Sequence, residues 1–387
     1  MNFETKAIRL QTDRSQFQEH STPLYLTSSF VFEDAEDMRS SFAEEKERNL
    51  YSRFSNPNTA EFVNKIVSLE GAEAGYAFAT GMSAIFSTFA ALLSSEDHII
   101  SCRSVFGSTH SLFTNYLPKW NISTSYFNAD ETNFIESLIT DHTKILYVET
   151  PTNPGVDVLD LEIIGSIAKK HNLLFIVDNC FATPYLQNPI QYGADLVVHS
   201  ATKLIDGQGR VLGGVTVGKK ELMRDIYLFS RNTGPAMSPF NAWILSKSLE
   251  TLSVRVEKHC ENALNLAHSL ENNEKVNFVK YPFLRSHPNY EIAKKQMKLG
   301  GNILVFEVKG GIKYAQKFLN NLKMCSLSAN LGDTRTIVTH PASSTHSKLS
   351  IEDLLKVGIT EGLIRVSVGL ENSDDIIYDL IQALGDE

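Results

Sequence analysis

The sequence predicts an α/β fold: a large domain with a mostly parallel sheet, followed by a smaller C-terminal α/β domain. Short runs rich in Val, Ile and Leu recur through the first half of the chain, as expected for strands buried on both faces of a parallel sheet. Segments with helical spacing of apolar residues separate these runs. The length of 387 residues, 42% of them hydrophobic, is enough for two domains, or three.

The strands of the large domain are predicted from five short apolar runs. These runs cover residues 75–80, 98–102, 144–150, 173–179 and 194–200. After the first run we expect a turn at Gly81 and then a helix through residues 83–93. That region, residues 74–95, has no charged residue, but its many Gly, Ser and Thr residues argue against a membrane span.

Two helical patterns organise the rest of the chain. The segment 161–171 places isoleucines on one face, and His171 with Asn172 can close that helix. A longer pattern begins near Ser246 and runs to residue 273, which is consistent with a hinge helix between the domains. Beyond it, residues 302–311 and 363–371 are typical of strands of the smaller domain.

The net charge of the chain and the composition of its first residues limit the kinds of partner that we expect. The formal net charge is -9 and no block of basic residues occurs, so nucleic acid and anionic membrane surfaces are not expected partners. A small-molecule partner fits this composition better. The first fifteen residues carry charges throughout and lack the apolar core of a secretory signal.

The four cysteines indicate the compartment and exclude one kind of site. Cys102, Cys180, Cys260 and Cys325 lie far apart without paired spacing, which argues against a disulfide framework and against a zinc site. We therefore expect reduced thiols, no metal and a cytoplasmic protein.

Candidate site residues follow the predicted strands, because ligands of open α/β sheets bind beyond the carboxyl ends of the strands. Taken singly, each has an ordinary structural explanation, such as a solvated lysine or a helix-capping aspartate. Together they form a coherent set: Gly81 and Met82, Asn153, Asp178, and Ser200, Thr202 and Lys203.

The chemistry of this set points to one cofactor. A helix N-terminus with Gly81, joined by the Ser200 and Thr202 hydroxyls, can hold a phosphate. The Asp178 carboxylate can pair with a protonated ring nitrogen, and the Lys203 amine can condense with an aldehyde. Phosphate, ring nitrogen and aldehyde are the binding groups of pyridoxal 5′-phosphate.

Several motifs resemble the Cys/Met metabolism family of pyridoxal-phosphate enzymes, the transsulfuration group, and the resemblance covers almost the whole chain. The resemblance implies fold type I and identifies Lys203 as the lysine that binds the cofactor covalently. The motifs are YSRFSNPNT (51–59), ATGMSAI (79–85), ETPTNP (149–154), VDN (177–179), HSATKLIDGQG (199–209), LGDTRTIVTHPASSTH (331–346) and IRVSVGLE (364–371).

The resemblance also assigns roles around the cofactor and implies self-association. Gly81, Met82, Ser200 and Thr202 would bind the phosphate, and Asp178 would keep the ring nitrogen protonated. Residues 1–55 would form an arm that contacts a neighbouring subunit, residues 56–250 the cofactor-binding domain and residues 251–387 the small domain. Tyr51 and Arg53 would reach from the arm to the phosphate of that neighbour, within a homodimer or homotetramer.

Substrate binding is predicted at three positions. Arg365 is suited to the substrate α-carboxylate, because a guanidinium can grip a carboxylate with two parallel hydrogen bonds. The resemblance places Asn330 near the same carboxylate, and Asn153 near the cofactor ring and that carboxylate. His340 and His346 are interpreted as structural residues.

One position departs from the family pattern. Many members stack a tyrosine on the cofactor ring in a motif similar to YGGT, whereas this chain reads VFGST and places Phe106 there. Stacking is retained and the phenol is lost, so Lys203 itself would supply any proton transfer that the phenol performs elsewhere. The nearby Ser108 stands where methionine γ-lyases tend to carry cysteine, which counts against that activity.

The family resemblance favours γ-replacement on an O-acylhomoserine, with O-succinylhomoserine the preferred ester. Sulfide or cysteine would be the acceptor, giving homocysteine or cystathionine in methionine biosynthesis. The alternative is a cystathionine β- or γ-lyase, or a methionine γ-lyase, since these enzymes share nearly every catalytic residue. A nicotinamide dehydrogenase and a phosphate-loop hydrolase are disfavoured, because their glycine motifs are absent from the sequence.

Overall fold

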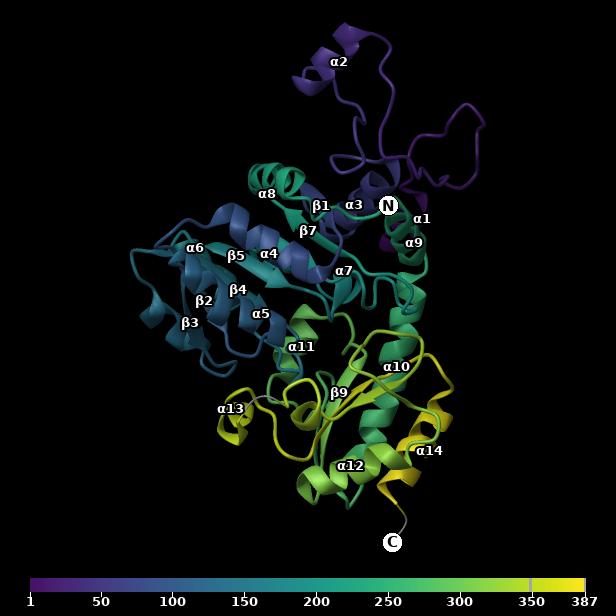
Figure 1. The fold of residues 1–387 in the computed structure, drawn as a ribbon. Coiled ribbons are helices and arrows are strands. Elements are labelled where there is room, and N and C mark those ends of the chain that lie inside the picture. Colours follow the sequence, from purple (N-terminus) through teal and green to yellow (C-terminus); the bar gives the residue numbers. More distant parts are fainter. Residues whose placement is uncertain (348–349, 386–387) are drawn as a thin grey trace.

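The computed structural model describes residues 1–347 and 350–385, which form a large and a small α/β unit (Figure 1). Within these residues the large sheet has seven strands in the order β1-β7-β6-β5-β4-β2-β3. Their bounds are β1 Ala74–Phe78, β2 His98–Cys102, β3 Ser123–Phe127, β4 Thr143–Glu149, β5 Leu174–Asp178, β6 Leu196–His199 and β7 Gly214–Gly218. The predicted α/β class is confirmed.

The large sheet is parallel except at one strand. β2, β3, β4, β5 and β6 pair in parallel, whereas β7 runs antiparallel to both β1 and β6. β1 therefore points the same way as β6, and the carboxyl ends of β1, β2, β4, β5 and β6 meet at one edge. The sequence did not predict β7, because its glycine-flanked residues continue a glycine-rich loop.

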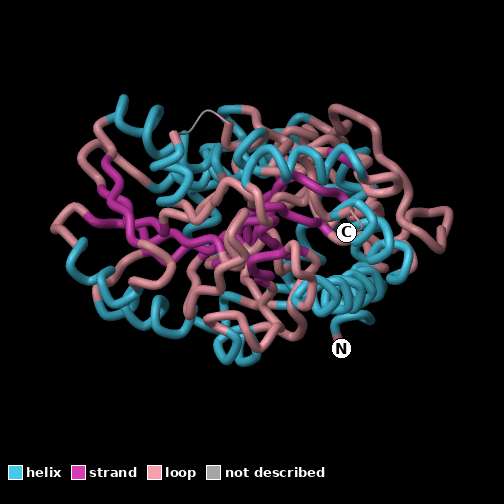
Figure 2. Tube along the Cα trace, turned by 90° about the horizontal axis from the view of Figure 1, so that it is seen from below, coloured by secondary structure: helices cyan, strands magenta, loops and turns pink. Residues whose placement is uncertain are grey.

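Helices cover both faces of this sheet (Figure 2). Successive strand residues point to opposite faces, so Ile176 and Val177 of β5 enter different hydrophobic clusters. One face is covered by α3 (Pro57–Glu70) and α6 (Leu161–Lys170), and the other by α4 (Gly81–Leu92) and α8 (Lys220–Thr233). This double cover explains why the strands read as continuous apolar runs.

The long helical pattern that begins near Ser246 is split in the structure. α9 (Pro239–Leu249) ends before α10 (Leu252–Glu271) begins. The carbonyl of Ser248 accepts hydrogen bonds from the backbone N–H of Thr251 (3.2 Å) and the guanidinium of Arg255 (2.9 Å). These hydrogen bonds end α9 before α10 begins. The periodic spacing of apolar residues alone does not reveal such a break.

α10 connects the two units and contributes to the core of each (Figure 1). Its first half places Leu252, Val256 and Cys260 in the core on the α3 face of the large sheet. Its second half places Ala263 and Leu270 in the core of the small unit. One helix is therefore common to both cores.

The small unit is built on a second sheet with the order β10-β11-β12-β9-β8. Its strands are β8 Val276–Lys280, β9 Ile303–Val308, β10 Ser326–Leu327, β11 Ile337–Thr339 and β12 Leu363–Ser367. α10, α12 (Gly311–Asn321) and α14 (Ser373–Leu384) pack together around it. β9 and β12 confirm the two strands predicted there.

The remaining helices are short. They are α1 Phe3–Arg9, α2 Ala35–Phe42, α5 Gly107–Ser111, α7 Thr183–Leu186, α11 Tyr290–Gln296 and α13 Ile351–Lys356. Among the described residues, no helix is both long enough and apolar enough to cross a bilayer. The segment that carries α2 extends away from the body at the top of Figure 1.

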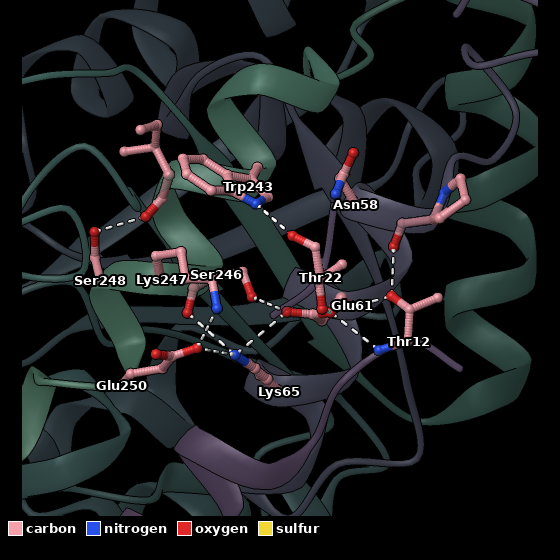
Figure 3. Close-up of polar contacts among 12 residues, drawn as sticks. Thr12, Thr22, Asn58, Glu61, Lys65, Trp243, Ser246, Lys247, Ser248 and Glu250 are labelled. Atoms are coloured by element: carbon pink, nitrogen blue, oxygen red, sulfur yellow. Dashed lines mark hydrogen bonds and ion pairs between the residues drawn. The ribbon is translucent and has the colours of Figure 1, made fainter. Parts of the chain in front are cut away.

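The base of this N-terminal segment is tied to the large unit through Glu61 of α3 (Figure 3). Its buried carboxylate accepts hydrogen bonds from the Thr12 backbone N–H (3.0 Å) and from the Ser246 hydroxyl (2.6 Å). The Thr22 hydroxyl donates to it as well, and the Lys65 ammonium lies 3.4 Å away. Burial would raise the pKa of Glu61, but these hydrogen bonds and Lys65 outweigh it and lower the pKa.

Replacing Glu61 with glutamine should loosen residues 12–22. We expect the Glu61→Gln protein to lose about 1.5–3 kcal/mol of stability, the usual contribution of a hydrogen bond to a charged group. Because the folded pKa is depressed, this stabilisation is complete above the unfolded value of about 4.5 and is lost as the pH falls through the folded pKa. Urea unfolding at several pH values and hydrogen exchange of residues 12–22 measure the effect.

Glu162→Gln is the matched control for that experiment. Glu162 is an exposed carboxylate paired with Lys295, so its loss should change stability by less than about 0.5 kcal/mol. Equal hydrogen exchange of residues 12–22 in the wild type and in Glu61→Gln would contradict the anchoring role of Glu61.

Candidate active site

The predicted site residues of the large unit gather at the edge where the parallel strands end. β5 ends in Asp178, β6 ends just before Ser200, and β1 leads into α4 at Gly81. β5 pairs with both β4 and β6, so these loops lie side by side. The rule that polar residues after parallel strands converge is met at this edge.

The start of α4 is arranged to receive an anion. Thr80 caps the helix: its hydroxyl accepts a hydrogen bond from the Ser83 N–H (3.0 Å). The N–H groups of Gly81 and Met82 belong to the first turn and have no partner within the helix. A Cβ on Gly81 would lie 2.6 Å from the Cβ of Ser200, so only glycine allows this close approach.

Thr202 lies in the loop that follows β6, and its hydroxyl already has partners. It donates to the Gly213 carbonyl (3.2 Å) and accepts from the Gly213 N–H (3.1 Å). Thr202 therefore closes the glycine-rich loop onto the end of β6. A phosphate contact from this hydroxyl would need its hydrogen to turn away from Gly213.

Asp178 is a buried carboxylate at the end of β5, with 5% of its surface exposed. Its Oδ1 accepts the backbone N–H of Cys180 (3.0 Å), and its Oδ2 accepts the Tyr147 hydroxyl (3.3 Å). Burial raises the pKa of Asp178 to about 6, opposed by the Cys180 N–H, by His199 and by Tyr147. A cationic ring nitrogen beside this carboxyl would favour its ionised form.

Lys203 follows β6 and is half-buried. Its ammonium donates a hydrogen bond to the Asn330 side-chain oxygen at 2.6 Å. Burial lowers the pKa of Lys203, and the positive charge of Arg365 lowers it further. The free amine, which is the nucleophilic and basic form, is therefore more accessible near neutral pH.

Arg365 comes from β12 of the small unit and is 3% exposed. One guanidinium nitrogen donates to the Asn153 side-chain oxygen (3.0 Å), and another donates to the Asn330 carbonyl (3.2 Å). Its Nε is buried without a partner among the described residues. Lys203, Asn330, Arg365 and Asn153 thus form one connected group that joins the two units.

Phe106 lies just before α5, and 43% of its surface is exposed. Its backbone N–H donates to the Glu149 carboxyl at 2.8 Å. An aromatic ring that is half open to solvent and held by its backbone provides a surface on which another ring can stack.

Tyr51 and Arg53 lie apart from this group in the chain. Arg53 donates to the Arg231 carbonyl, and its guanidinium lies over the Tyr51 ring (5.3 Å) and the Phe54 ring (4.9 Å). The Arg53 carbonyl accepts a hydrogen bond from the Tyr76 hydroxyl of β1, and Tyr51 forms a β-bridge with Ser29. Among the described residues, neither Tyr51 nor Arg53 has a polar contact with Lys203, Asp178 or Arg365. His340 is buried and bonded to Ser343 and the Glu361 carbonyl within the small unit.

Sequence reasoning missed several residues of the site. Glu149 and Tyr147 of β4 lie next to Asp178, and a buried pair, His199 and Glu70, joins β6 to the end of α3 at 2.6 Å. Glu149 ends its strand, so inspection of strand ends could have found it. Tyr147 lies within β4 and Glu70 ends a helix rather than a strand, so neither gave such a signal.

The arrangement fits pyridoxal phosphate. A helix start for the phosphate, a buried carboxylate for the ring nitrogen, an exposed aromatic face and a lysine of lowered pKa lie at one edge. The comparisons agree. The family described as "Cys/Met metabolism PLP-dependent enzyme" matches residues 4–385. The fold and site therefore define a pyridoxal-phosphate-dependent enzyme of fold type I.

The chain belongs to the Cys/Met metabolism family of pyridoxal-phosphate-dependent enzymes, as its motifs indicated. It is 44% identical to an O-succinylhomoserine sulfhydrylase of Pseudomonas aeruginosa, over 99% of this chain and 95% of that one. It is 42% identical to an L-methionine gamma-lyase of Fusobacterium nucleatum, over 98% and 97%.

Solved structures show the same fold. A Campylobacter jejuni protein assigned as an O-acetylhomoserine (thiol)-lyase superposes with a TM-score of 0.95 at 34% identity, over 100% of both chains. That structure contains N'-pyridoxyl-lysine-5'-monophosphate.

Proposed function

We propose that this enzyme replaces the γ substituent of an O-acylhomoserine, preferentially O-succinylhomoserine, with sulfide or cysteine. The products are homocysteine or cystathionine. Similarity to an O-succinylhomoserine sulfhydrylase over almost the full length of both chains supports this choice. Gly81, Met82, Ser200 and Thr202 bind the cofactor phosphate, Asp178 binds the ring nitrogen and Phe106 stacks on the ring.

The observation that carries the proposal is the group formed by Lys203, Asn330 and Arg365. The Lys203 ammonium is 2.6 Å from the Asn330 side chain, and the Asn330 carbonyl is 3.2 Å from Arg365. A base and a carboxylate-binding guanidinium therefore share one neighbour. A substrate whose α-carboxylate pairs with Arg365 and Asn153 would place its Cα proton near the Lys203 amine.

The proposed proton transfers use this chain's own residues. Bound pyridoxal phosphate supplies an electron sink for the charge that develops at Cα. The Lys203 amine takes the proton from Cα, and Arg365 holds the carboxylate during this step. A further proton leaves Cβ, and the acyloxy group departs from Cγ as a carboxylate. The thiol or sulfide then adds at Cγ with loss of its proton, and protons return to Cβ and to Cα to give the product.

A γ-lyase is the second candidate, supported by 42% identity to an L-methionine gamma-lyase. A lyase needs the same proton acceptor and the same carboxylate site, so these residues do not separate the two reactions. Ser108 stands against it, because methionine γ-lyases tend to carry cysteine at that position.

A product assay separates the two. The cofactor-loaded enzyme is given O-succinylhomoserine or O-acetylhomoserine with sulfide or with cysteine, and in parallel cystathionine or methionine alone. Homocysteine or cystathionine formed from an ester is the expected result. Ammonia and a 2-oxo acid from cystathionine or methionine, with both esters inert, would show a lyase instead.

We further propose that residues 1–55 form an arm that completes the site of a second copy of the chain, with Tyr51 and Arg53 at its phosphate. Large apolar side chains of this arm are exposed, including Phe17 (81%), Leu26 (67%) and Val31 (89%). A second subunit covering the arm would remove this apolar surface from water.

Mixed subunits test this arrangement. Arg53→Ala and Lys203→Ala homo-oligomers should both be nearly inactive. After the two are dissociated and reassembled together, a mixed dimer contains one site with both native residues, and activity should return to a substantial fraction of wild type. Mixed dimers that form, as seen by native mass spectrometry, yet stay inactive would contradict a shared site.

A further inference from the structure

Glu149 is a second buried carboxyl group beside Asp178. The two residues are register partners on the adjacent parallel strands β4 and β5, and their side chains lie on the same face of the sheet. Only 3% of Glu149 and 5% of Asp178 is exposed. Two carboxyl groups held this close and away from water resist carrying two negative charges.

Several acidic groups interact electrostatically with Glu149. Among the described residues these include Asp178, Tyr147, Cys102 and Cys180. Burial, and then the charge of Asp178, raise the pKa of Glu149 well above its usual range. The backbone N–H groups of Phe106 and Asn153 lower it by less.

The two carboxyl groups differ in their hydrogen bonds. Asp178 accepts from both the Cys180 N–H and the Tyr147 hydroxyl, and His199 also favours its charged form. Glu149 instead accepts from the Phe106 N–H at 2.8 Å, at the start of the loop that presents the aromatic ring. The Tyr147 hydroxyl and His199 thus favour the charged form of Asp178 in addition to a backbone N–H, whereas Glu149 accepts from backbone N–H groups, one of which belongs to the loop that carries Phe106.

We propose that Glu149 is a positioning residue: it remains a neutral carboxylic acid beside ionised Asp178 and fixes Phe106 through the backbone N–H of that residue. The inference rests on the proposed role of Asp178 at the cofactor ring. With Glu149 neutral, Asp178 carries the one negative charge of this pair, which matches one protonated ring nitrogen. Glu149 also holds the Phe106 ring in the stacking position.

Two isosteric substitutions test the charge assignment. Glu149→Gln keeps the shape, is permanently neutral and retains an oxygen for the Phe106 N–H. We expect its affinity for pyridoxal phosphate, measured by fluorescence titration of the apo-protein, to stay within about threefold of the wild-type value. A threefold change corresponds to about 0.6 kcal/mol of binding free energy. Asp178→Asn should lose affinity and lower kcat by about 100-fold or more.

A third variant and a spectrum test the positioning role. Glu149→Ala leaves the Phe106 N–H without its acceptor, so we expect weaker cofactor binding and an altered absorption spectrum of the bound cofactor. Subtracting the infrared spectrum of Glu149→Gln from that of the wild type should reveal the carbonyl stretch of a protonated carboxylic acid. The wild type alone carries this group at position 149. The band does not depend on turnover.

The outcomes are distinguishable. If Glu149→Gln is as impaired as Asp178→Asn, or if the infrared band is absent from the wild type, Glu149 acts as a carboxylate and the inference is wrong. If Glu149→Ala retains wild-type cofactor affinity and absorption, Glu149 positions nothing. If Asp178→Asn retains full activity, the proposed role of Asp178 fails, whatever Glu149 does.

Discussion

Lys203→Ala is expected to bind pyridoxal phosphate without a covalent bond and to lose nearly all turnover. Removal of a general base costs about 10²–10⁴-fold in kcat, and loss of the covalent attachment adds to this. The measurement is kcat with the preferred ester. Peptide mass spectrometry after borohydride reduction should find the pyridoxyl adduct on Lys203 in the wild type and none in the variant.

Two further lysine variants make this result specific. Lys203→Arg keeps the positive charge but has no amine that can attack an aldehyde, so it should be as inactive as Lys203→Ala. Lys219→Ala removes a surface lysine paired with Asp195 at the opposite edge of the sheet and should retain activity. A Lys203→Ala protein with more than about a tenth of wild-type kcat would rule out the assigned base.

Arg365→Lys should weaken substrate binding far more than it slows the chemical steps. Lysine retains the charge but cannot form two parallel hydrogen bonds to a carboxylate. Loss of such a bond costs about 1.5–3 kcal/mol, so we expect KM to rise about 10- to 150-fold with a smaller change in kcat. Steady-state kinetics with the preferred ester measure both quantities.

A substrate analogue provides the control for Arg365. An analogue that lacks the α-carboxylate should bind the wild type and Arg365→Lys equally weakly. An equal KM in both proteins for the carboxylate substrate would exclude Arg365 as its partner.

The part of the site that lies at the strand ends could be predicted from the sequence. Asp178 and Lys203 follow apolar runs that are recognisable within a few residues, and parallel strands bring their carboxyl ends together whatever the rest of the chain does. The start of α4, which we propose binds the phosphate, depends on a local signal as well, a glycine after a strand and before a helix. The residues that we propose bind the cofactor can therefore be predicted from local sequence patterns.

The contacts between the two units could not be predicted in the same way. The hydrogen bond from Lys203 to Asn330 joins residues 127 positions apart, and that from Arg365 to Asn153 joins residues 212 positions apart. Both depend on how the small sheet packs against the large one. The pairing of Glu149 with Asp178 depends on strand order and register, which the apolar runs do not specify.

Because α10 belongs to both hydrophobic cores, the two units are joined by one continuous helix rather than by a flexible linker. Lys203 comes from the large unit and Arg365 from the small one, so a small bend of α10 would change the distance between these two side chains directly. The same feature restricts recombination between relatives. A chimaera joined at residues 250–251 would separate Leu252 and Val256 from the large core that they fill. A crossover in the middle of α10, between Cys260 and Ala263, keeps each half with its own partners and should give the better-folded hybrid.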